Sequence, residues 1–295
     1  MTGSEPLGYA LVTPVRNEEE NLRRLAECVV SQTVAPQAWL IVDNGSSDLT
    51  RERAAELAAS HDWIHVLEAP EPVQIRGAPI VRAVLVGLEA LEPWPDVVVK
   101  LDADVSFEPD HFERLLARFA AEPRLGIASS LCLEQEAGQW RPTYSTRSHA
   151  RGAVRAYRRA CLADVMPLEQ RLGWDGIDEL KAAVCGWRTA TIHDIVFFHH
   201  RKAGEREGAY ARWRRQGETA HYMGYRPSYL VLRALYRAWR EPSALAMVPG
   251  YLGAVLSRSP RYADAEVRAW LRQEQSLRRL RKRAREALGR SETAS

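Results

Sequence analysis

Short apolar runs alternate with helical segments through the first hundred residues of this 295-residue chain. The apolar runs are rich in Val, Ile and Leu, which is typical of strands buried on both faces of a parallel sheet. In chain order we expect strand 9–14, helix 17–30, strand 39–43, helix 50–60, strand 64–68, helix 78–91 and strand 97–101. This alternation predicts an α/β fold with a doubly wound, mostly parallel sheet flanked by helices.

Two carboxylates, Asp102 and Asp104, directly follow the strand expected at 97–101. Open α/β sheets bind ligands in the crevice beyond the carboxyl ends of their strands, so both acids face that crevice. Hard cations such as Mg²⁺ and Mn²⁺ take oxygen ligands and often bridge to substrate phosphates. The pair is therefore a candidate clamp for a metal–diphosphate unit, although one Asp-x-Asp match is equally typical of a solvated strand end.

A further acid, Asp43, closes the strand expected at 39–43 and precedes the turn Asn44-Gly45-Ser46-Ser47. A carboxylate there can accept hydrogen bonds from a base N–H or from ribose hydroxyls, and it can equally well cap the turn. No Gly-x-Gly-x-x-Gly follows the first strand, which disfavours a dinucleotide-binding domain.

Three ordered motifs together resemble the successive signatures of family 2 glycosyltransferases, which have the GT-A fold and use nucleotide-diphosphate sugars. They are Thr13-Pro14-Val15-Arg16-Asn17-Glu18-Glu19, Val42-Asp43-Asn44-Gly45-Ser46-Ser47-Asp48 and Leu101-Asp102-Ala103-Asp104. The resemblance extends over residues 9–201. It implies that the donor nucleotide contacts Pro14, Asn17, Glu19, Asp43, Arg76 and Asp102, and that Asp104 binds the metal. The loop around Arg76 matches the Gly- and Asn-rich loop of the family only loosely.

The second chemical centre is Gly173–Ala182, where Asp178 and Glu179 open a helix expected to end near Cys185. Acids at this position can simply cap the helix. A carboxylate beside apolar Trp174 can also have a raised pKa, as a general base requires.

Family 2 enzymes hold the acidic pair that supplies the base at this place, and here Asp175 and Asp178 stand in for an adjacent Glu-Asp. We favour Asp178 as the base, because it precedes the apolar face of the helix, with Asp175 positioning the acceptor. The reverse assignment is nearly as well supported. Trp174 and Glu179 are assigned to the acceptor side.

Further strands are expected at 127–133, 152–159 and 195–201, with a turn at Gln139–Pro142. The last strand ends in His199, His200 and Arg201. An imidazole suits Mn²⁺ or a diphosphate oxygen, and a guanidinium suits the negative charge that develops on a leaving group. His199 and His200 are therefore candidate metal ligands, and Arg201 a candidate contact of the diphosphate.

The sequence thus predicts an inverting, metal-dependent glycosyltransferase that uses Mn²⁺ or Mg²⁺ and a UDP- or GDP-sugar. The expected acceptor is a hydroxyl of a saccharide or a lipid-linked molecule, in cell-envelope polysaccharide or glycoconjugate synthesis. Two alternatives stay open: a polyprenyl-phosphate sugar synthase, and a non-catalytic sugar-nucleotide-binding protein of the same fold.

We expect residues 1–201 to form the catalytic domain and residues 202–295 a basic, α-helical extension, which holds about half of all Lys and Arg. Helical periodicity appears at 229–239 and 263–287. The extension is expected to contact the acceptor, an anionic membrane surface or another copy. Its Arg and aromatic residues are not supported by any other nucleic-acid-binding feature, so no nucleic-acid partner is expected.

Four scattered cysteines, Cys28, Cys132, Cys161 and Cys185, fit a reducing compartment. The first residues lack the pattern of a signal peptide, and no apolar run approaches the length of a bilayer span. We therefore expect a cytoplasmic protein, with peripheral contact at the inner face of the cell membrane.

Overall fold

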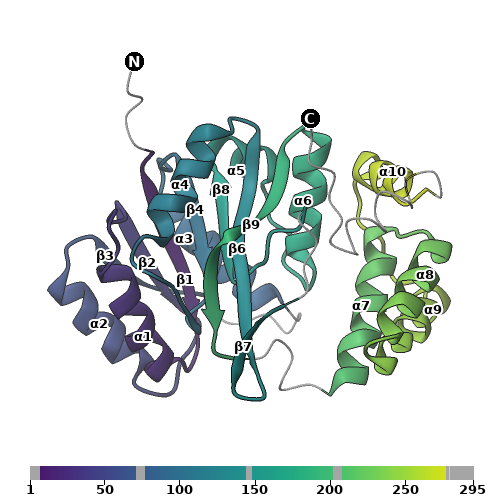
Figure 1. The fold of residues 1–295 in the computed structure, drawn as a ribbon, viewed down its shortest axis with the longest axis horizontal. Coiled ribbons are helices and arrows are strands. Elements are labelled where there is room, and N and C mark those ends of the chain that lie inside the picture. The colour runs from purple at the N-terminus through teal and green to yellow at the C-terminus, as the bar shows by residue number, and fades with distance from the viewer. Residues whose placement is uncertain (1–6, 71–76, 144–147, 202–207, 277–278, 280–295) are drawn as a thin grey trace. The chain divides into compact units, whose positions relative to one another are not determined.

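The computed structural model describes residues 7–70, 77–143, 148–201, 208–276 and 279. The chain forms two compact units, residues 1–201 and residues 202–295, which we call the N-terminal and C-terminal units. Figure 1 shows the sheet and its covering helices in the first unit, and a group of helices in the second.

A nine-stranded sheet organises the N-terminal unit, in the order β3-β2-β1-β4-β8-β6-β9-β5, with β7 paired to β6. The strands are β1 Tyr9–Val15, β2 Ala38–Asp43, β3 Ile64–Glu68, β4 Val97–Leu101, β5 Val105–Ser106, β6 Leu125–Glu136, β7 Gln139–Pro142, β8 Val154–Arg158 and β9 Arg188–His199. Strands β3, β2, β1 and β4 are parallel, as the alternation of apolar runs predicts. Strand β8 is antiparallel to β4 and β6, whereas β9 is parallel to β6. The predicted α/β fold is confirmed, with a mixed second half.

Helices cover both faces of this sheet (Figure 1). They are α1 Glu19–Val30, α2 Thr50–Ser60, α3 Ala78–Ala90, α4 His111–Ala121, α5 Arg159–Val165 and α6 Trp174–Val184. Successive residues of a strand point to opposite faces, so Leu11 of β1 joins the core under α1 and α4 while Val12 joins the core under α3 and α5. This two-sided burial explains the continuous apolar runs.

Residues Gln139–Pro142, expected to be a turn, form strand β7 instead. The turn lies two residues earlier, where Ala137 and Gly138 have φ of 50° and 79°. Positive φ at both central residues matches the twist of a tight hairpin. The ring of Trp140 then packs edge-on against Phe198 of β9, with centroids 5.0 Å apart, which holds the hairpin on the sheet.

The C-terminal unit is helical, as predicted, with α7 Ala209–Met223, α8 Pro227–Ala238, the 3-10 helix η1 Pro242–Ala246, α9 Met247–Leu256 and α10 Ala265–Glu274. Its core includes Trp213, Leu230 and Met247. Helices α7 and α9 cross with their backbones in close approach at Gly217 and Gly250, where any side chain would meet main-chain atoms. None of the helices in the described part of the chain is both long and apolar enough to cross a bilayer.

Candidate active site

The loops after β1 and β2, which carry the first two motifs, are joined by hydrogen bonds. The main-chain N–H of Asn17 donates to Ser46 Oγ at 3.0 Å, and Asn17 Oδ1 accepts from the N–H of Ser47 at 2.8 Å. The N–H of Glu18 donates to Thr50 Oγ1 at 2.8 Å. Asn17 has φ of 55°, a left-handed conformation that Asn adopts more readily than most residues. The two motifs therefore form one continuous edge at the carboxyl ends of the strands.

Asp43 has a buried carboxylate that accepts from the N–H of Ser46 at 3.2 Å and from Arg51 Nη2 at 2.9 Å. The capping role considered for Asp43 is thus present. Pro14 pairs with Val42, beside Asp43 in the register of β1 and β2. The N–H of Glu19 donates to an oxygen of Asp48 at 3.4 Å. Arg76 lies outside the described residues, and the nucleotide contacts of this group stay predictions.

Asp102 follows β4 and is held by the buried Lys100, whose ammonium pairs with its carboxylate. Lys100 Nζ also donates to the carbonyl of Gly152 at 2.8 Å, and the N–H of Asp102 donates to the carbonyl of Ala153 at 2.8 Å. These bonds fix the end of β4 against the start of β8. The side chain of Asp102 is 30% exposed, so it still reaches the ligand edge.

Asp104 lies beside the end of β9, with its Oδ1 3.3 Å from Nε2 of His199. The next residue, His200, points to the other face of the strand, where its Nε2 lies 2.7 Å from Ser106 Oγ and its ring packs against Trp140. Of the two candidate imidazoles, His199 is therefore the one beside the Asp-x-Asp pair.

The charges of Asp104 and His199 support each other. Burial lowers the pKa of His199, but hydrogen bonds with Asp104, Cys132 and Glu134 outweigh it and raise this pKa to about 11. Burial raises the pKa of Asp104, but His199 and the charge of Arg201 together hold it below the ordinary value. In the absence of a cation His199 is therefore protonated. Once its Nε2 proton is displaced, the pair offers one carboxylate and one imidazole nitrogen, a donor set that suits Mn²⁺ and also accommodates Mg²⁺.

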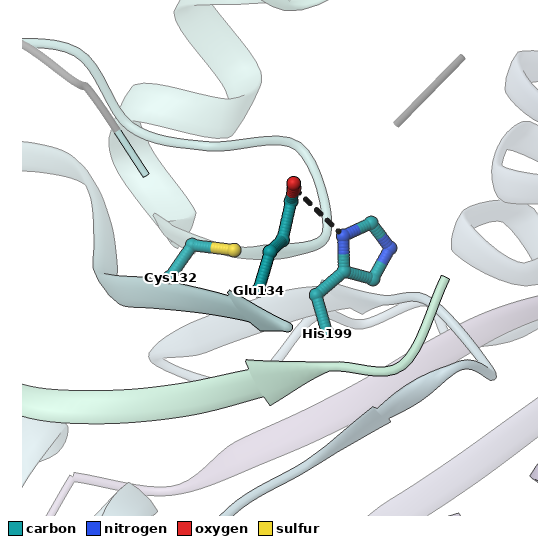
Figure 2. A group of neighbouring side chains, drawn as sticks. All are labelled: Cys132, Glu134 and His199. Atoms are coloured by element: carbon teal, nitrogen blue, oxygen red, sulfur yellow. Dashed lines mark hydrogen bonds and ion pairs between the residues drawn. The ribbon is translucent and has the colours of Figure 1, made fainter. Parts of the chain in front are cut away.

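The second nitrogen of His199 faces Glu134, as Figure 2 shows. Glu134 Oε1 lies 3.4 Å from His199 Nδ1 and 2.5 Å from Arg151 Nη2. Potential ligand atoms of Cys132, Glu134 and His199 lie within 4.8 Å of one another. Because the guanidinium of Arg151 contacts the same carboxylate oxygen, we interpret Glu134 as orienting His199 so that its Nε2 faces Asp104.

Arg201 is held at the same edge by Glu18, which the sequence analysis did not assign. The two guanidinium nitrogens of Arg201 lie 2.8 and 2.7 Å from the two oxygens of Glu18, and its Nη1 lies 3.7 Å from Asp104 Oδ2. This bidentate pair has fixed geometry and places a permanent positive charge beside Asp104. Glu18 belongs to the first motif, and its position there is the only signal that could have identified it.

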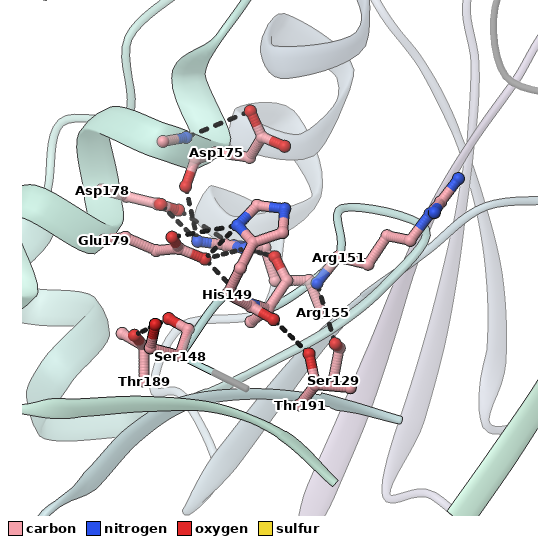
Figure 3. Close-up of polar contacts among 12 residues, drawn as sticks. Ser129, Ser148, His149, Arg151, Arg155, Asp175, Asp178, Glu179, Thr189 and Thr191 are labelled. Carbon is pink, nitrogen blue, oxygen red and sulfur yellow. Dashed lines mark hydrogen bonds and ion pairs between the residues drawn. The ribbon is translucent and has the colours of Figure 1, made fainter. Parts of the chain in front are cut away.

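The acids of α6 differ sharply in exposure. Asp178 is 1% exposed, and both of its oxygens are occupied: Oδ1 by Arg155 Nη2, and Oδ2 by Arg155 Nε at 3.2 Å and by the hydroxyl of Tyr157. Burial raises the pKa of Asp178, and the guanidinium of Arg155 opposes that rise. Figure 3 shows Asp178 beside Arg155, together with Asp175 and Glu179.

Asp175 is partly exposed, and its carboxylate lies near Gly152, where an added Cβ would be 3.6 Å from Oδ2. Gly152 is the residue whose carbonyl binds Lys100. The main-chain carbonyl of Asp175 accepts from Arg155 Nη2 at 2.8 Å. Asp175 therefore lies next to the end of β4, and Arg155 fixes both it and Asp178.

Trp174 and Glu179, assigned to the acceptor side, also contribute to this framework. The Trp174 ring centroid lies 5.9 Å from Lys100 Nζ and 5.8 Å from the guanidinium carbon of Arg155. Glu179 Oε1 accepts from the N–H of Ala150 at 2.8 Å and lies 3.2 Å from Arg155 Nη1. Trp174 is buried and Glu179 is partly exposed, so Glu179 ties the segment before β8 to α6.

Comparison with known proteins decides the family. Residues 10–162 match the family model described as Glycosyl transferase family 2. The chain is a member of this glycosyltransferase family. Its first two motifs, its Asp-x-Asp pair and strand β8 all lie inside the matched region, so the resemblance inferred from the motifs is confirmed.

Two curated relatives are similar to parts of this glycosyltransferase. Glycosyltransferase AglE of Haloferax volcanii is 26% identical over 216 residues, 68% of each chain. Polyprenol monophosphomannose synthase of Mycolicibacterium smegmatis is 36% identical over 122 residues, which cover 40% of this chain and 43% of that protein.

Two solved structures share the fold. A mannosyltransferase from Pyrobaculum calidifontis, in complex with GDP-Man and Mn²⁺, has a TM-score of 0.59 at 17% identity and covers 98% of this chain and 89% of its own. TarS of S. aureus, in complex with UDP, has a TM-score of 0.53 at 16% identity, with 70% of this chain and 64% of that chain covered. The predicted GT-A fold of this glycosyltransferase is therefore confirmed.

Four residues of the site were missed as participants by the sequence analysis: Glu18, Lys100, Glu134 and Arg155. Besides Glu18, which belongs to the first motif, Lys100 and Arg155 carried a usable signal, because they are cations in buried strands, where an unpaired charge is too costly to persist. Glu134 carried no signal, since its role depends on the pairing of β6 with β9.

Proposed function

We propose that this glycosyltransferase is an inverting, metal-dependent enzyme that transfers a sugar from a UDP- or GDP-sugar to an acceptor hydroxyl of a saccharide or lipid-linked molecule. The observation that carries the proposal is the convergence of Asp102, Asp104, His199 and Arg201 on one edge of the sheet, with the carboxylate of Asp175 next to it. Acids, an imidazole and a guanidinium at this edge are the groups that a nucleotide-diphosphate donor requires.

Asp104 and His199 are the residues that would hold Mn²⁺ or Mg²⁺, with Glu134 fixing the orientation of the imidazole. A bound divalent cation neutralises negative charge on the donor diphosphate. Arg201 adds a second positive charge at the leaving group, and Glu18 keeps its guanidinium in place. Asp102 and the loops bearing Asn17 and Asp43 are proposed to bind ribose and base.

We propose Asp175 rather than Asp178 as the general base, although the sequence alone led us to prefer Asp178. Asp178 is buried with both oxygens engaged, so an acceptor cannot reach it. Asp175 is proposed to take the proton of the acceptor hydroxyl, whose oxygen bonds to the anomeric carbon as the bond to the diphosphate breaks. One such displacement inverts the configuration at that carbon.

Thermal stability with nucleotides tests the donor site. UDP, GDP, CDP and dTDP are each added with Mn²⁺, Mg²⁺ or EDTA, because a ligand that binds the native state raises the melting temperature. We expect one diphosphate to raise the melting temperature strongly, and only with metal. Equal stabilisation in EDTA would contradict the metal-dependent site.

A second candidate function is polyprenyl-phosphate sugar synthesis, favoured by the 36% identity to a polyprenol monophosphomannose synthase. Its acceptor is a phosphate anion, which needs little help from a base. An Asp175→Asn variant with full transfer activity would favour this candidate. Donor affinity without turnover on any acceptor would favour a non-catalytic binding protein.

Both catalytic candidates agree with a role in cell-envelope polysaccharide or glycoconjugate synthesis. We propose that the enzyme works in the cytoplasm, in peripheral contact with the inner face of the cell membrane. The excess of Lys and Arg after Arg201 supports this contact.

A further inference from the structure

Helix α8 exposes a stripe of large apolar side chains. Val231 and Leu235 of α8 and Trp239, the residue that caps its C-terminus, follow each other at intervals of four residues. Leu232 and Tyr236 lie beside them on the same face. Leu235 is 57% exposed and Trp239 91% exposed. We call these five residues the α8 stripe.

The opposite face of α8 already has its partners. Leu230 and Ala234 are 2% and 0% exposed and pack into the core of the C-terminal unit with Trp213 and Met247. Core packing therefore does not explain the α8 stripe. Helix α9, which contacts α8, adds further exposed apolar residues, among them Leu256 at 84% exposure. A contiguous exposed apolar patch commonly marks a site of interaction with a protein or a membrane.

The charge of the C-terminal unit points to an anionic partner. Residues 202–295 contain 20 Lys and Arg against 9 Asp and Glu, a net charge of +11. Residues 1–201 contain 21 against 29, a net charge of −8. The net charge of the whole chain is only +3 because the charges of the two units largely cancel. Positive charge is therefore concentrated on the unit that carries the α8 stripe.

Three arginines of the same unit are available for such a partner. Arg261, Arg268 and Arg272 line a cavity of about 240 Å³ beside Gly224. Their guanidinium groups form no hydrogen bond or ion pair with any residue that the structure describes. Guanidinium groups bind phosphate oxygens with strong, charge-assisted hydrogen bonds.

We propose that the C-terminal unit docks on an anionic phospholipid bilayer through the α8 stripe. The apolar side chains enter the boundary between headgroups and acyl chains, and Arg261, Arg268 and Arg272 bind lipid phosphates. The rings of Tyr236 and Trp239 are of the kind that concentrates at this boundary. This inference deepens the membrane contact under the proposed function, on which it rests for its biological purpose, because docking brings the enzyme to lipid-linked acceptors.

Vesicle co-sedimentation of the full chain tests the docking surface. We expect binding to phosphatidylcholine vesicles that contain phosphatidylglycerol and much weaker binding to phosphatidylcholine alone. The double variant Leu235→Ser/Trp239→Ser should bind the mixed vesicles about 100-fold more weakly, because each lost large apolar contact weakens binding by roughly tenfold or more. Arg261→Gln/Arg272→Gln should weaken binding about tenfold or more, since each cation near the surface contributes about 1 kcal/mol.

Leu49→Ser is the matched control, because Leu49 is 48% exposed but belongs to the N-terminal unit. It should bind vesicles like the wild type. Unchanged vesicle binding of the Leu235→Ser/Trp239→Ser variant would overturn the proposal. So would a wild type that binds neither kind of vesicle. Light scattering adds a third arm: a wild-type dimer that this double variant converts to a monomer would assign the α8 stripe to a second copy instead.

All vesicle measurements are made without donor or metal. The proposal on docking and the proposed function are therefore tested independently of each other. Vesicle binding that depends on the α8 stripe would support the docking surface even if no nucleotide stabilised the protein, an outcome that would count against the proposed function alone.

Discussion

The two acidic pairs of the site, Asp102 with Asp104 and Asp175 with Asp178, are built on a similar plan. In each pair a cation on a strand holds one carboxylate: Lys100 of β4 binds Asp102, and Arg155 of β8 binds Asp178. The pairs differ in depth. The held carboxylate is 30% exposed for Asp102 and 1% exposed for Asp178. The comparison shows that the same kind of ion pair leaves a carboxylate accessible to a ligand near the surface, and makes it a structural group when both partners are buried.

The largest effect is expected at the pair of Asp102 and Asp104. Asp104→Ala removes the carboxylate that lies beside His199 and should lower transfer activity by about 1,000-fold or more, or at least about 4 kcal/mol of transition-state stabilisation. The measurement is kcat/KM over a range of Mn²⁺ concentrations. Near-normal rates in this variant would show that Asp104 does not hold the metal.

The buried ion pair of Asp178 with Arg155 should show its largest effect in stability. Arg155→Met leaves the Asp178 carboxylate without its cation, and breaking a buried ion pair in this way costs about 3–5 kcal/mol of unfolding free energy. Urea denaturation measures the loss. A loss below about 1 kcal/mol would mean that the pair behaves like an exposed salt bridge.

Glu134→Gln tests how the imidazole of His199, which lies beside Asp104, is oriented. Loss of the carboxylate at His199 Nδ1 should weaken Mn²⁺ binding by about 10- to 100-fold, the usual effect of removing a residue that orients a metal ligand. Titration of Mn²⁺ in the presence of the stabilising nucleotide gives the affinity. Unchanged affinity would leave Glu134 with Arg151 as a purely structural contact.

The smallest effect is expected for Lys100→Met, the counterpart of Arg155→Met. Asp102 can be solvated once Lys100 is gone, so the loss of unfolding free energy should be only about 1–2 kcal/mol. Urea denaturation of the two variants side by side compares the pairs directly. Equal losses would show that exposure does not distinguish them.

The parallel half of the fold could be predicted because its signal is local. Each apolar run by itself indicates a buried strand. Asp43 at the end of β2 and Asp102 after β4 directly adjoin strands that can be predicted from such runs. The placement of β7 could not be predicted in this way, since a turn at Ala137 and Gly138 is preferred only once β6 has paired with its neighbours.

The sequence could nominate the members of the candidate site but not their partners. Asp104, His199 and Asp175 are all candidates from sequence, and their roles stay predictions. The choice of His199 over His200 needs the register of β5 with β9. The choice between Asp175 and Asp178 needs the contact of Asp178 with Arg155, which lies 23 residues away in the chain. Such contacts depend on the folded arrangement of β8 and α6, which no local pattern encodes.

The most direct test of the account compares kcat and melting temperature of Asp175→Asn and Asp178→Asn with the natural donor and acceptor. We predict that Asp175→Asn lowers kcat by about 100- to 10,000-fold, as loss of a general base does, and leaves the melting temperature unchanged. Asp178→Asn should lower the melting temperature and affect kcat much less. The opposite pattern, with catalysis lost in a stable Asp178→Asn variant and kept in Asp175→Asn, would contradict the assignment of Asp175 as the base.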